Sequence, residues 1–136
     1  MIDAIVDTGS LVAVLNRRES HHLWAIDQLD SMRLPLLTCE PVITEVLFLL
    51  SHSSIAVQGL WRLIQDGEIV IPFSLNDERE AIQKLMMKYA DQPMSLADAC
   101  LVWMSELFPE HFLFTLDSDF KTYRRFGRRV IPLITP

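Results

Sequence analysis

The stretch Ile5-Val6-Asp7-Thr8-Gly9-Ser10 decides how the start of the chain folds. The β-branched pair Ile5 and Val6 closes a short apolar run, and this pattern predicts a strand over residues 2–7. The Asp-Thr-Gly sequence that follows is typical of a turn, and a helix is expected over residues 10–18. The chain therefore opens with a strand that ends at an acidic side chain.

Short strands and helices alternate along the rest of the chain. Strands are expected at residues 68–73, 112–116 and 130–134, and residues 34–38 form a strand or an extended connector. Helices are expected after Ser20, at residues 41–50 and 55–65, after Asn76 or Asp77, from Ser95 to about Leu107, and up to Gly127 as a basic helix. This alternation predicts an α/β fold, a three-layer α/β/α sandwich around a mostly parallel central sheet of four to five strands.

Composition limits the class of protein. Half of the 136 residues are hydrophobic and 22% are charged, which excludes a disordered chain and fits a single domain over residues 1–136. No apolar run reaches the length of a membrane span and no basic leader precedes an apolar segment, so a cytoplasmic protein without membrane contact is expected. Cys39 and Cys100 are expected to be buried free thiols rather than a disulfide or a zinc site.

Four acidic residues occupy positions that such a fold brings together. Asp7 and Asp117 each follow a predicted strand, and α/β proteins form their sites outside the carboxyl ends of strands. Glu45 and Asp98 lie near the starts of two apolar helices. Carboxylates among apolar neighbours are costly to bury unless a cation neutralises them, and a ligand set made only of oxygen favours Mg²⁺ or Mn²⁺.

Each of these acids also has a purely structural interpretation. Asp7 fits a helix cap or an Asx-turn, and Asp98 fits a capping box as the third residue after a serine. Glu45 fits an exposed helix face, while Asp117 and Asp119 both fit caps of the last predicted helix. Residue patterns alone leave both interpretations open for each acid.

Four short segments occur in an order and spacing that cover the full chain: Ile5-Val6-Asp7-Thr8-Gly9-Ser10-Leu11-Val12-Ala13, Thr44-Glu45-Val46, Ser95-Leu96-Ala97-Asp98-Ala99 and Phe114-Thr115-Leu116-Asp117-Ser118-Asp119-Phe120. With these segments the chain resembles a PIN domain, specifically the small stand-alone nucleases of the VapC toxin type. The resemblance implies metal-dependent cleavage of RNA, with Mg²⁺ or Mn²⁺ as cofactor. It also implies a small antitoxin protein as partner and a homodimer.

The resemblance carries residue roles onto matching positions. Asp7, Glu45, Asp98 and Asp117 correspond to the acidic catalytic positions of the family, and the metal is expected at Asp7, Asp98, Asp117 and Asp119. A hydroxyl like that of Thr115, two residues before Asp117, is often seen near the site in similar proteins. Cleavage is expected to leave a 5′-phosphate and a 3′-hydroxyl.

A basic segment follows the last acidic motif. Residues 1–120 carry a net charge of −11 and residues 121–136 a net charge of +5. RNA phosphates are expected to contact four of these basic residues, namely Lys121, Arg124, Arg125 and Arg128. Tyr123 and Phe126 are expected to face the core rather than to stack on a base.

The acidic residues predict a metal site, and the resemblance implies that the protein is a metal-dependent endoribonuclease and the toxin of a toxin–antitoxin pair. Two alternatives stay open: a metal-dependent hydrolase of another phosphoester such as DNA, and a catalytically silent PIN fold that binds RNA or protein. The apolar helix at residues 42–50 and the helix that contains Trp61 are expected to provide a homodimer face or an antitoxin groove.

Overall fold

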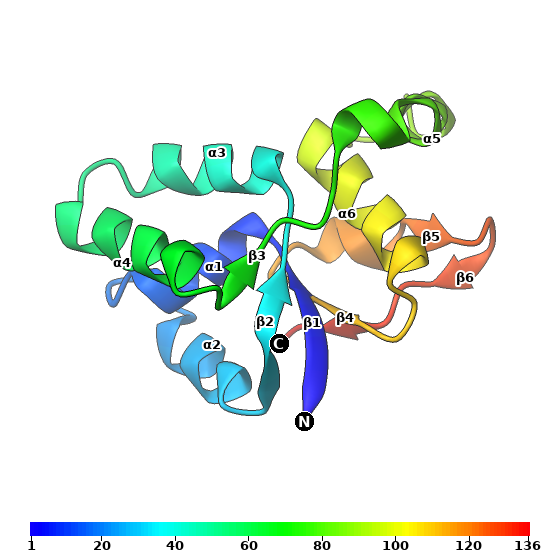
Figure 1. The fold of residues 1–136 in the computed structure, drawn as a ribbon. Helices are drawn as coiled ribbons and strands as arrows, with labels where there is room; N and C mark the ends of the chain where they lie inside the picture. The colour runs from blue at the N-terminus through cyan, green and yellow to red at the C-terminus, as the bar shows by residue number, and fades with distance from the viewer.

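The computed structural model describes all 136 residues (Figure 1). Its centre is a five-stranded sheet of order β3-β2-β1-β4-β7 in which every neighbouring pair is parallel. The strands are β1 (Ile2–Val6), β2 (Met32–Leu37), β3 (Ile69–Val70), β4 (Phe112–Phe114) and β7 (Leu133–Ile134). The predicted α/β fold with a mostly parallel sheet is confirmed.

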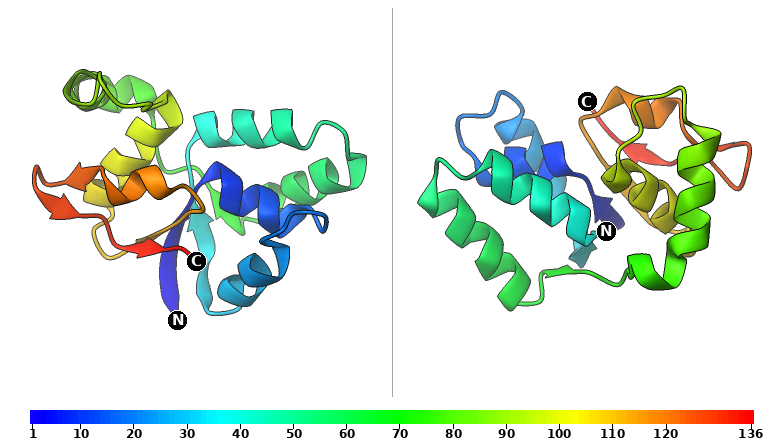
Figure 2. Two further views of the ribbon diagram at one scale, coloured as in Figure 1. Left: turned by 180° about the vertical axis from the view of Figure 1, so that it is seen from behind. Right: turned by 90° about the horizontal axis from the view of Figure 1, so that it is seen from above.

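Helices cover both faces of the sheet (Figures 1 and 2). One side carries α1 (Thr8–Leu15), α2 (His22–Leu29), α3 (Glu40–Leu49) and α4 (Ser54–Gln65). The other side carries α6 (Leu96–Leu107), which packs on β1 and β4, and α5 (Leu75–Lys88), which packs on α6. Because both faces are covered, the central strands consist almost entirely of apolar residues, as parallel sheets require.

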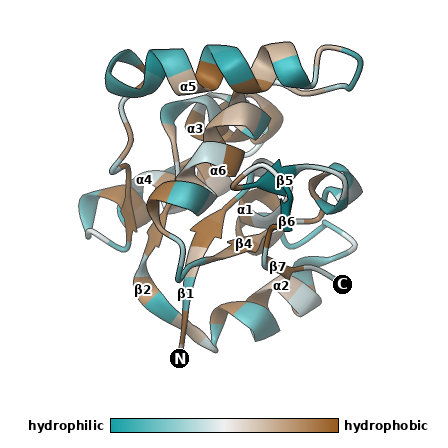
Figure 3. Cartoon of the chain, turned by 90° about the vertical axis from the view of Figure 1, so that its right-hand side faces the viewer, coloured by the Kyte–Doolittle hydropathy of each residue, from teal (hydrophilic) through white to brown (hydrophobic).

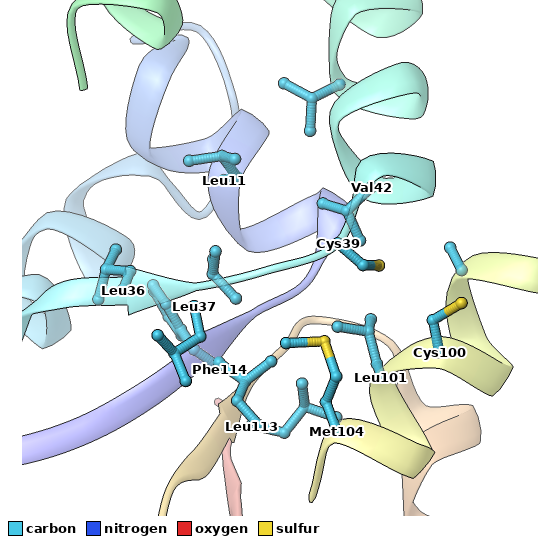
Figure 4. Close-up of a cluster of buried hydrophobic side chains, with 14 of the residues drawn as sticks. Leu11, Leu36, Leu37, Cys39, Val42, Cys100, Leu101, Met104, Leu113 and Phe114 are labelled. Carbon is cyan, nitrogen blue, oxygen red and sulfur yellow. The ribbon is translucent and has the colours of Figure 1, made fainter. Parts of the chain in front are cut away.

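The core lies between these layers (Figure 4). Thirty-one buried apolar residues form one continuous cluster, in which Ala4, Ile5 and Val6 of β1 are fully buried. Figure 3 shows the contrast between the hydrophobic strands of the sheet and the hydrophilic β5 strand outside it. No helix of the chain combines the length and the apolar character needed to cross a membrane.

The strand order places a topological switch point between β1 and β4. From β1 the chain proceeds through β2 to β3 on one side, whereas β4 and β7 lie on the other side. The connections leave the carboxyl ends of β1 and β4 in opposite directions, and this opens a crevice between them, where α/β proteins bind ligands. Asp7 directly follows β1, and Asp117 lies three residues after β4.

The predicted basic helix up to Gly127 is wrong. Residues Ser118–Lys121 form a single 3₁₀ turn, η1, and the chain then makes an antiparallel hairpin of β5 (Arg124–Arg125) and β6 (Arg129–Val130). Two residues at the hairpin tip have positive φ, 51° at Phe126 and 80° at Gly127, a conformation that glycine adopts freely and that no helix contains.

Three other boundaries in the structure differ from those predicted from the sequence. The strand predicted at residues 68–73 is limited to β3, because Pro72 cannot donate to a ladder. The strand predicted at residues 130–134 is divided between β6 and β7, and Pro132 lies in the gap, where its carbonyl accepts from the Leu113 N–H. The cap of α5 is Ser74 rather than Asn76 or Asp77.

Candidate active site

Asp7 joins the end of β1 to the start of α1. Its backbone N–H still donates to Phe114 of β4 at 3.0 Å, so the residue is held between the two central strands. Oδ1 accepts from the Thr8 N–H at 2.6 Å and caps α1. Oδ2 accepts from the Thr115 hydroxyl at 2.7 Å. The side chain is only 6% exposed.

Thr115 links two of the acidic residues. Its fully buried hydroxyl donates to Asp7 Oδ2 and accepts from the backbone N–H of Asp117 at 2.9 Å. Asp117 Oδ1 in turn accepts from the Asp119 N–H at 2.9 Å and caps η1. One threonine therefore fixes the loop after β4 relative to the acid after β1.

Asp98 is presented by the first turn of α6. Ser95 and Asp98 form a capping box, in which the Asp98 N–H donates to Ser95 Oγ at 3.0 Å and the Ser95 N–H donates to Asp98 Oδ2 at 3.3 Å. The hydroxyl of Tyr123 donates to the same Oδ2 at 3.3 Å. The predicted capping box is present, and it leaves Asp98 at the edge of the crevice.

Glu45 reaches the same region from α3. The side chain is exposed, and Oε1 accepts from the Thr8 hydroxyl at 2.9 Å. Thr8 is the first residue of α1, so this hydrogen bond ties the glutamate to the helix that Asp7 caps.

A hollow of about 270 Å³ opens among these acids. Its lining consists of Asp7, Thr8, Gly9, Glu45, Asp98, Leu116 and Asp117. The structure thus brings the four predicted catalytic acids together, although they are separated by up to 110 positions in the sequence. Their catalytic roles stay a prediction.

Burial makes this grouping of acids electrostatically unfavourable. Burial raises the pKa of Asp7 from 3.8 to about 6, against the hydrogen bonds from Thr115 and Thr8, and the charges of Asp98 and Asp117 raise it further. Burial likewise raises the pKa of Asp98, to which the charge of Asp117 also contributes. The one ion pair of the structure joins Arg33 to Asp3 and lies outside the hollow, so no basic side chain neutralises the four acids.

The donor set of the hollow fits a hard divalent cation. It consists of carboxylate oxygens, which Mg²⁺ and Mn²⁺ prefer, and these carboxylates lack a protein counter-charge. No three of the chain's Asp, Glu, His or Cys side chains are placed closely enough around one point to coordinate an ion. The acids therefore face one hollow without forming a preassembled cage.

Asp119 and the basic residues take different places. Asp119 does not line the hollow. Arg124 donates to the carbonyls of Lys121, Thr122 and Tyr123, which end η1, whereas Lys121 and Arg128 are exposed.

Arg125 also has main-chain partners, because its guanidinium donates to the carbonyls of Ser105 at 2.7 Å and Pro109 at 3.2 Å, at the end of α6. The predicted RNA contacts thus include two arginines that already bind the protein's own backbone. These contacts with RNA stay a prediction.

Sequence reasoning missed two hydroxyl groups. Thr8 holds Glu45, and nothing in the local pattern indicated this because the pair is 37 positions apart. Tyr123 is buried as expected, and its hydroxyl also contacts Asp98. Phe126, expected in the core, is instead 47% exposed at the hairpin tip, where the guanidinium groups of Arg125 and Arg129 lie near its ring.

Comparison with known proteins agrees with this architecture. The family model of the PIN domain matches residues 4–125, so the chain belongs to the PIN domain family. A solved structure with the same fold is that of Mycobacterium tuberculosis VapC20, which is described as a sarcin-ricin loop cleaving toxin. The superposition has a TM-score of 0.75 at 18% sequence identity and covers 88% of this chain and 94% of that chain. A search of curated proteins finds no match.

Proposed function

We propose that this protein is a metal-dependent endoribonuclease and the toxin of a toxin–antitoxin pair. One observation carries the proposal: four carboxylates line a single hollow at the switch point of the sheet, without any basic side chain to neutralise them. A fold that had only to be stable would gain by replacing these acids with uncharged residues. Membership of the PIN domain family and the likeness to a toxin structure support the same function.

The residues of the hollow have different roles in phosphodiester hydrolysis. Asp7, Asp98 and Asp117 would hold the Mg²⁺ or Mn²⁺ ion, while Asp119, which does not line the hollow, remains a sequence-based prediction as a ligand. When bound, the ion supplies positive charge to the phosphodiester and acidifies a water molecule. Glu45, exposed at the hollow and held by Thr8, would orient the attacking water and accept its proton, while the bond from phosphorus to the 3′-oxygen breaks and that oxygen takes a proton from solvent.

The decisive experiment compares Asp7→Asn with a matched control, Asp3→Asn, whose carboxylate lies at the opposite end of β1. Single-stranded RNA is incubated with each protein in Mn²⁺ and in EDTA, and cleavage is followed on a gel. We expect the wild-type protein and Asp3→Asn to cleave only in Mn²⁺, and Asp7→Asn to cleave at least about a hundred times more slowly. Cleavage by Asp7→Asn at the wild-type rate would refute the assignment.

The same assay separates the alternative functions. Single-stranded DNA and a simple phosphodiester such as bis-p-nitrophenyl phosphate are offered beside RNA. Faster hydrolysis of either one by the wild-type protein would favour a different phosphoesterase. Binding of RNA without cleavage in Mn²⁺ would favour a silent PIN fold. We expect RNA to be the preferred substrate.

Partner binding is proposed for the apolar surface of α3 and α4. Phe48 is 77% exposed and Ile55 is 82% exposed, and Leu49 and Trp61 add partly exposed apolar side chains. An apolar surface of this kind marks an interaction site. We assign it to a second copy of the chain or to an antitoxin. Phe48→Ser combined with Ile55→Ser is expected to lower the mass measured by light scattering, or to abolish antitoxin co-purification.

A further inference from the structure

We propose that a second hollow, next to the acidic one, binds an unpaired nucleobase beside the scissile phosphate. This inference rests on the proposed ribonuclease function and names the part of the RNA that the protein reads. The hollow has a volume of about 690 Å³, which lies within the range of small-molecule sites. Residues from α3, from the end of the segment between β3 and α5, from the first turn of α5 and from the start of α6 line it.

The two hollows adjoin each other through Glu45, which lines both. Leu96 and Ala97, which line the second hollow, directly precede Asp98 of the acidic hollow in α6. A nucleotide whose phosphate lies among the acids can therefore place a neighbouring base in the second hollow. The shared lining makes this position part of the same substrate path.

The charge of the second hollow disfavours a phosphate group. No Lys, Arg or His lines it, and its two charged residues, Glu40 and Glu45, are both acidic. Phosphate oxygens would be repelled there, whereas an uncharged base would not. The occupant next to the acidic hollow is therefore a base and not the RNA backbone.

Its apolar residues offer surfaces for a flat ring. Phe73 is half-buried, and Leu75 and Leu96 keep 41% and 38% of their surface exposed at the hollow. Proteins that bind single-stranded RNA stack unpaired bases on aromatic and apolar side chains. These three residues can therefore cover the faces of the base.

Its polar residues can read the edge of the base. No hydrogen bond or ion pair within the protein engages the side chain of Glu40 or of Asn76, although the main-chain carbonyls of both residues accept hydrogen bonds. A carboxylate accepts from the exocyclic amino group of adenine, cytosine or guanine, whereas uracil offers it only the ring N3–H between two repelling carbonyl oxygens. The second hollow therefore favours a base with an amino group over uracil.

The test is a cleavage-site map on a single-stranded RNA library of random sequence, digested in Mn²⁺ and sequenced from the newly formed ends. For the wild-type protein we expect uracil to be depleted at one position that flanks the cut. Glu40→Gln and Asn76→Ala are expected to reduce this preference by about ten-fold, the size of one lost base contact. Glu80→Gln, an exposed carboxylate on α5 outside the second hollow, is the matched control and keeps the preference.

The possible failures are distinguishable. Absence of any RNA cleavage by the wild-type protein would overturn the proposed function and this inference together. Cleavage with equal base frequencies around the cut, or a preference that both variants retain, would overturn the inference alone. Glu40 and Asn76 are exposed, so their variants keep the fold, which circular dichroism checks.

As a second measurement, a synthetic RNA carries an abasic residue at the preferred position. The wild-type protein is expected to lose about ten-fold in kcat/KM on this RNA, since a stacked base is lost. Phe73→Ala is expected to show a smaller loss, because its stacking surface is already gone. An equal loss in both proteins would contradict stacking on Phe73.

Discussion

The acidic hollow and the basic segment that follows Asp117 use their charges in opposite ways. The carboxylates of Asp7 and Asp98 accept hydrogen bonds from hydroxyl and N–H groups and have no cationic partner. The guanidinium groups of Arg124 and Arg125 already bind main-chain carbonyls of the protein. The acids therefore keep unneutralised charge for a ligand, whereas these two arginines hold the fold together.

A charge pattern in a sequence therefore does not by itself reveal whether the charges bind a ligand or stabilise the fold. Clustered acids destabilise a fold by mutual repulsion and by loss of hydration, so their presence at one hollow indicates function. An arginine that caps the end of a helix or turn stabilises it by satisfying free carbonyls. Three comparisons of variants test this contrast.

The largest change in stability is expected for Asp7→Asn. Asp7 has a pKa of about 6 in the folded protein and 3.8 as its ordinary value, so the folded state favours the protonated form. The stability that the folded state gains from protonated Asp7 is fully present below pH 3.8 and is lost as the pH rises through 6. At pH 7.5 the loss amounts to about 3 kcal/mol.

Asparagine at this position has no charge to lose and still offers an oxygen to the Thr8 N–H. In EDTA at pH 7.5, the free energy of unfolding of Asp7→Asn is therefore expected to exceed that of the wild-type protein by up to about 3 kcal/mol, so the variant is the more stable protein. The difference should shrink towards pH 4. Urea unfolding at both pH values measures it. Addition of Mn²⁺ should stabilise the wild-type protein more than the variant. A variant that is less stable than wild type at pH 7.5 in EDTA would contradict this.

An intermediate effect is expected at Thr115. Thr115→Val removes a hydroxyl that serves both Asp7 and Asp117, and we expect a loss of about 2 kcal/mol in unfolding free energy. It also removes a hydrogen bond that lowers the pKa of Asp7, so the pH range over which stability is lost should extend to higher pH, as urea unfolding in EDTA at several pH values measures.

Thr38→Val is the matched control for this prediction. Thr38 is equally buried, and its hydroxyl donates to the Val6 carbonyl at 2.9 Å without contacting an acid. This variant is expected to lose about 1 kcal/mol in stability and to keep the wild-type pH dependence of stability in EDTA. An identical pH dependence of stability in the two variants would show that Thr115 does not act on the ionisation of Asp7.

The positions of the acids could be predicted from the sequence because each depends on a local signal. Asp7 follows a β-branched pair, and Asp98 stands three residues after a serine that begins a helix. The parallel arrangement of the strands then brings these local positions together at the switch point.

The basic segment could not be predicted in this way, because its fold depends on distant carbonyls. Arg125 finds its partners at the end of α6, 16 and 20 positions earlier, and no pattern within residues 121–129 encodes this contact. Gly127 fits the end of a helix, but a glycine with positive φ serves a hairpin turn equally well. The hydrogen bond from Thr8 to Glu45 escaped prediction for the same reason.

The smallest effects are expected from the arginines. These variants distinguish an arginine that stabilises the fold from one that binds RNA. Arg125→Met keeps the length of the side chain but leaves the carbonyls of Ser105 and Pro109 without a donor, so we expect a loss of roughly 1 to 2 kcal/mol in unfolding free energy. Arg128 is exposed and makes no hydrogen bond within the protein, and Arg128→Ala should leave stability unchanged.

For RNA binding, we expect the larger effect from Arg128→Ala and the smaller one from Arg125→Met. If Arg128 contacts a phosphate, Arg128→Ala lowers the slope of log K against log salt by about 0.7, the value for one phosphate contact on a single strand. Arg125→Met should leave the slope unchanged, because its guanidinium already serves the end of α6. Fluorescence anisotropy with a labelled RNA and the Asp7→Asn background, which prevents cleavage, measures both slopes. A larger change for Arg125→Met than for Arg128→Ala would mean that Arg125 exchanges its carbonyl partners for RNA, and the contrast between the two regions would then fail.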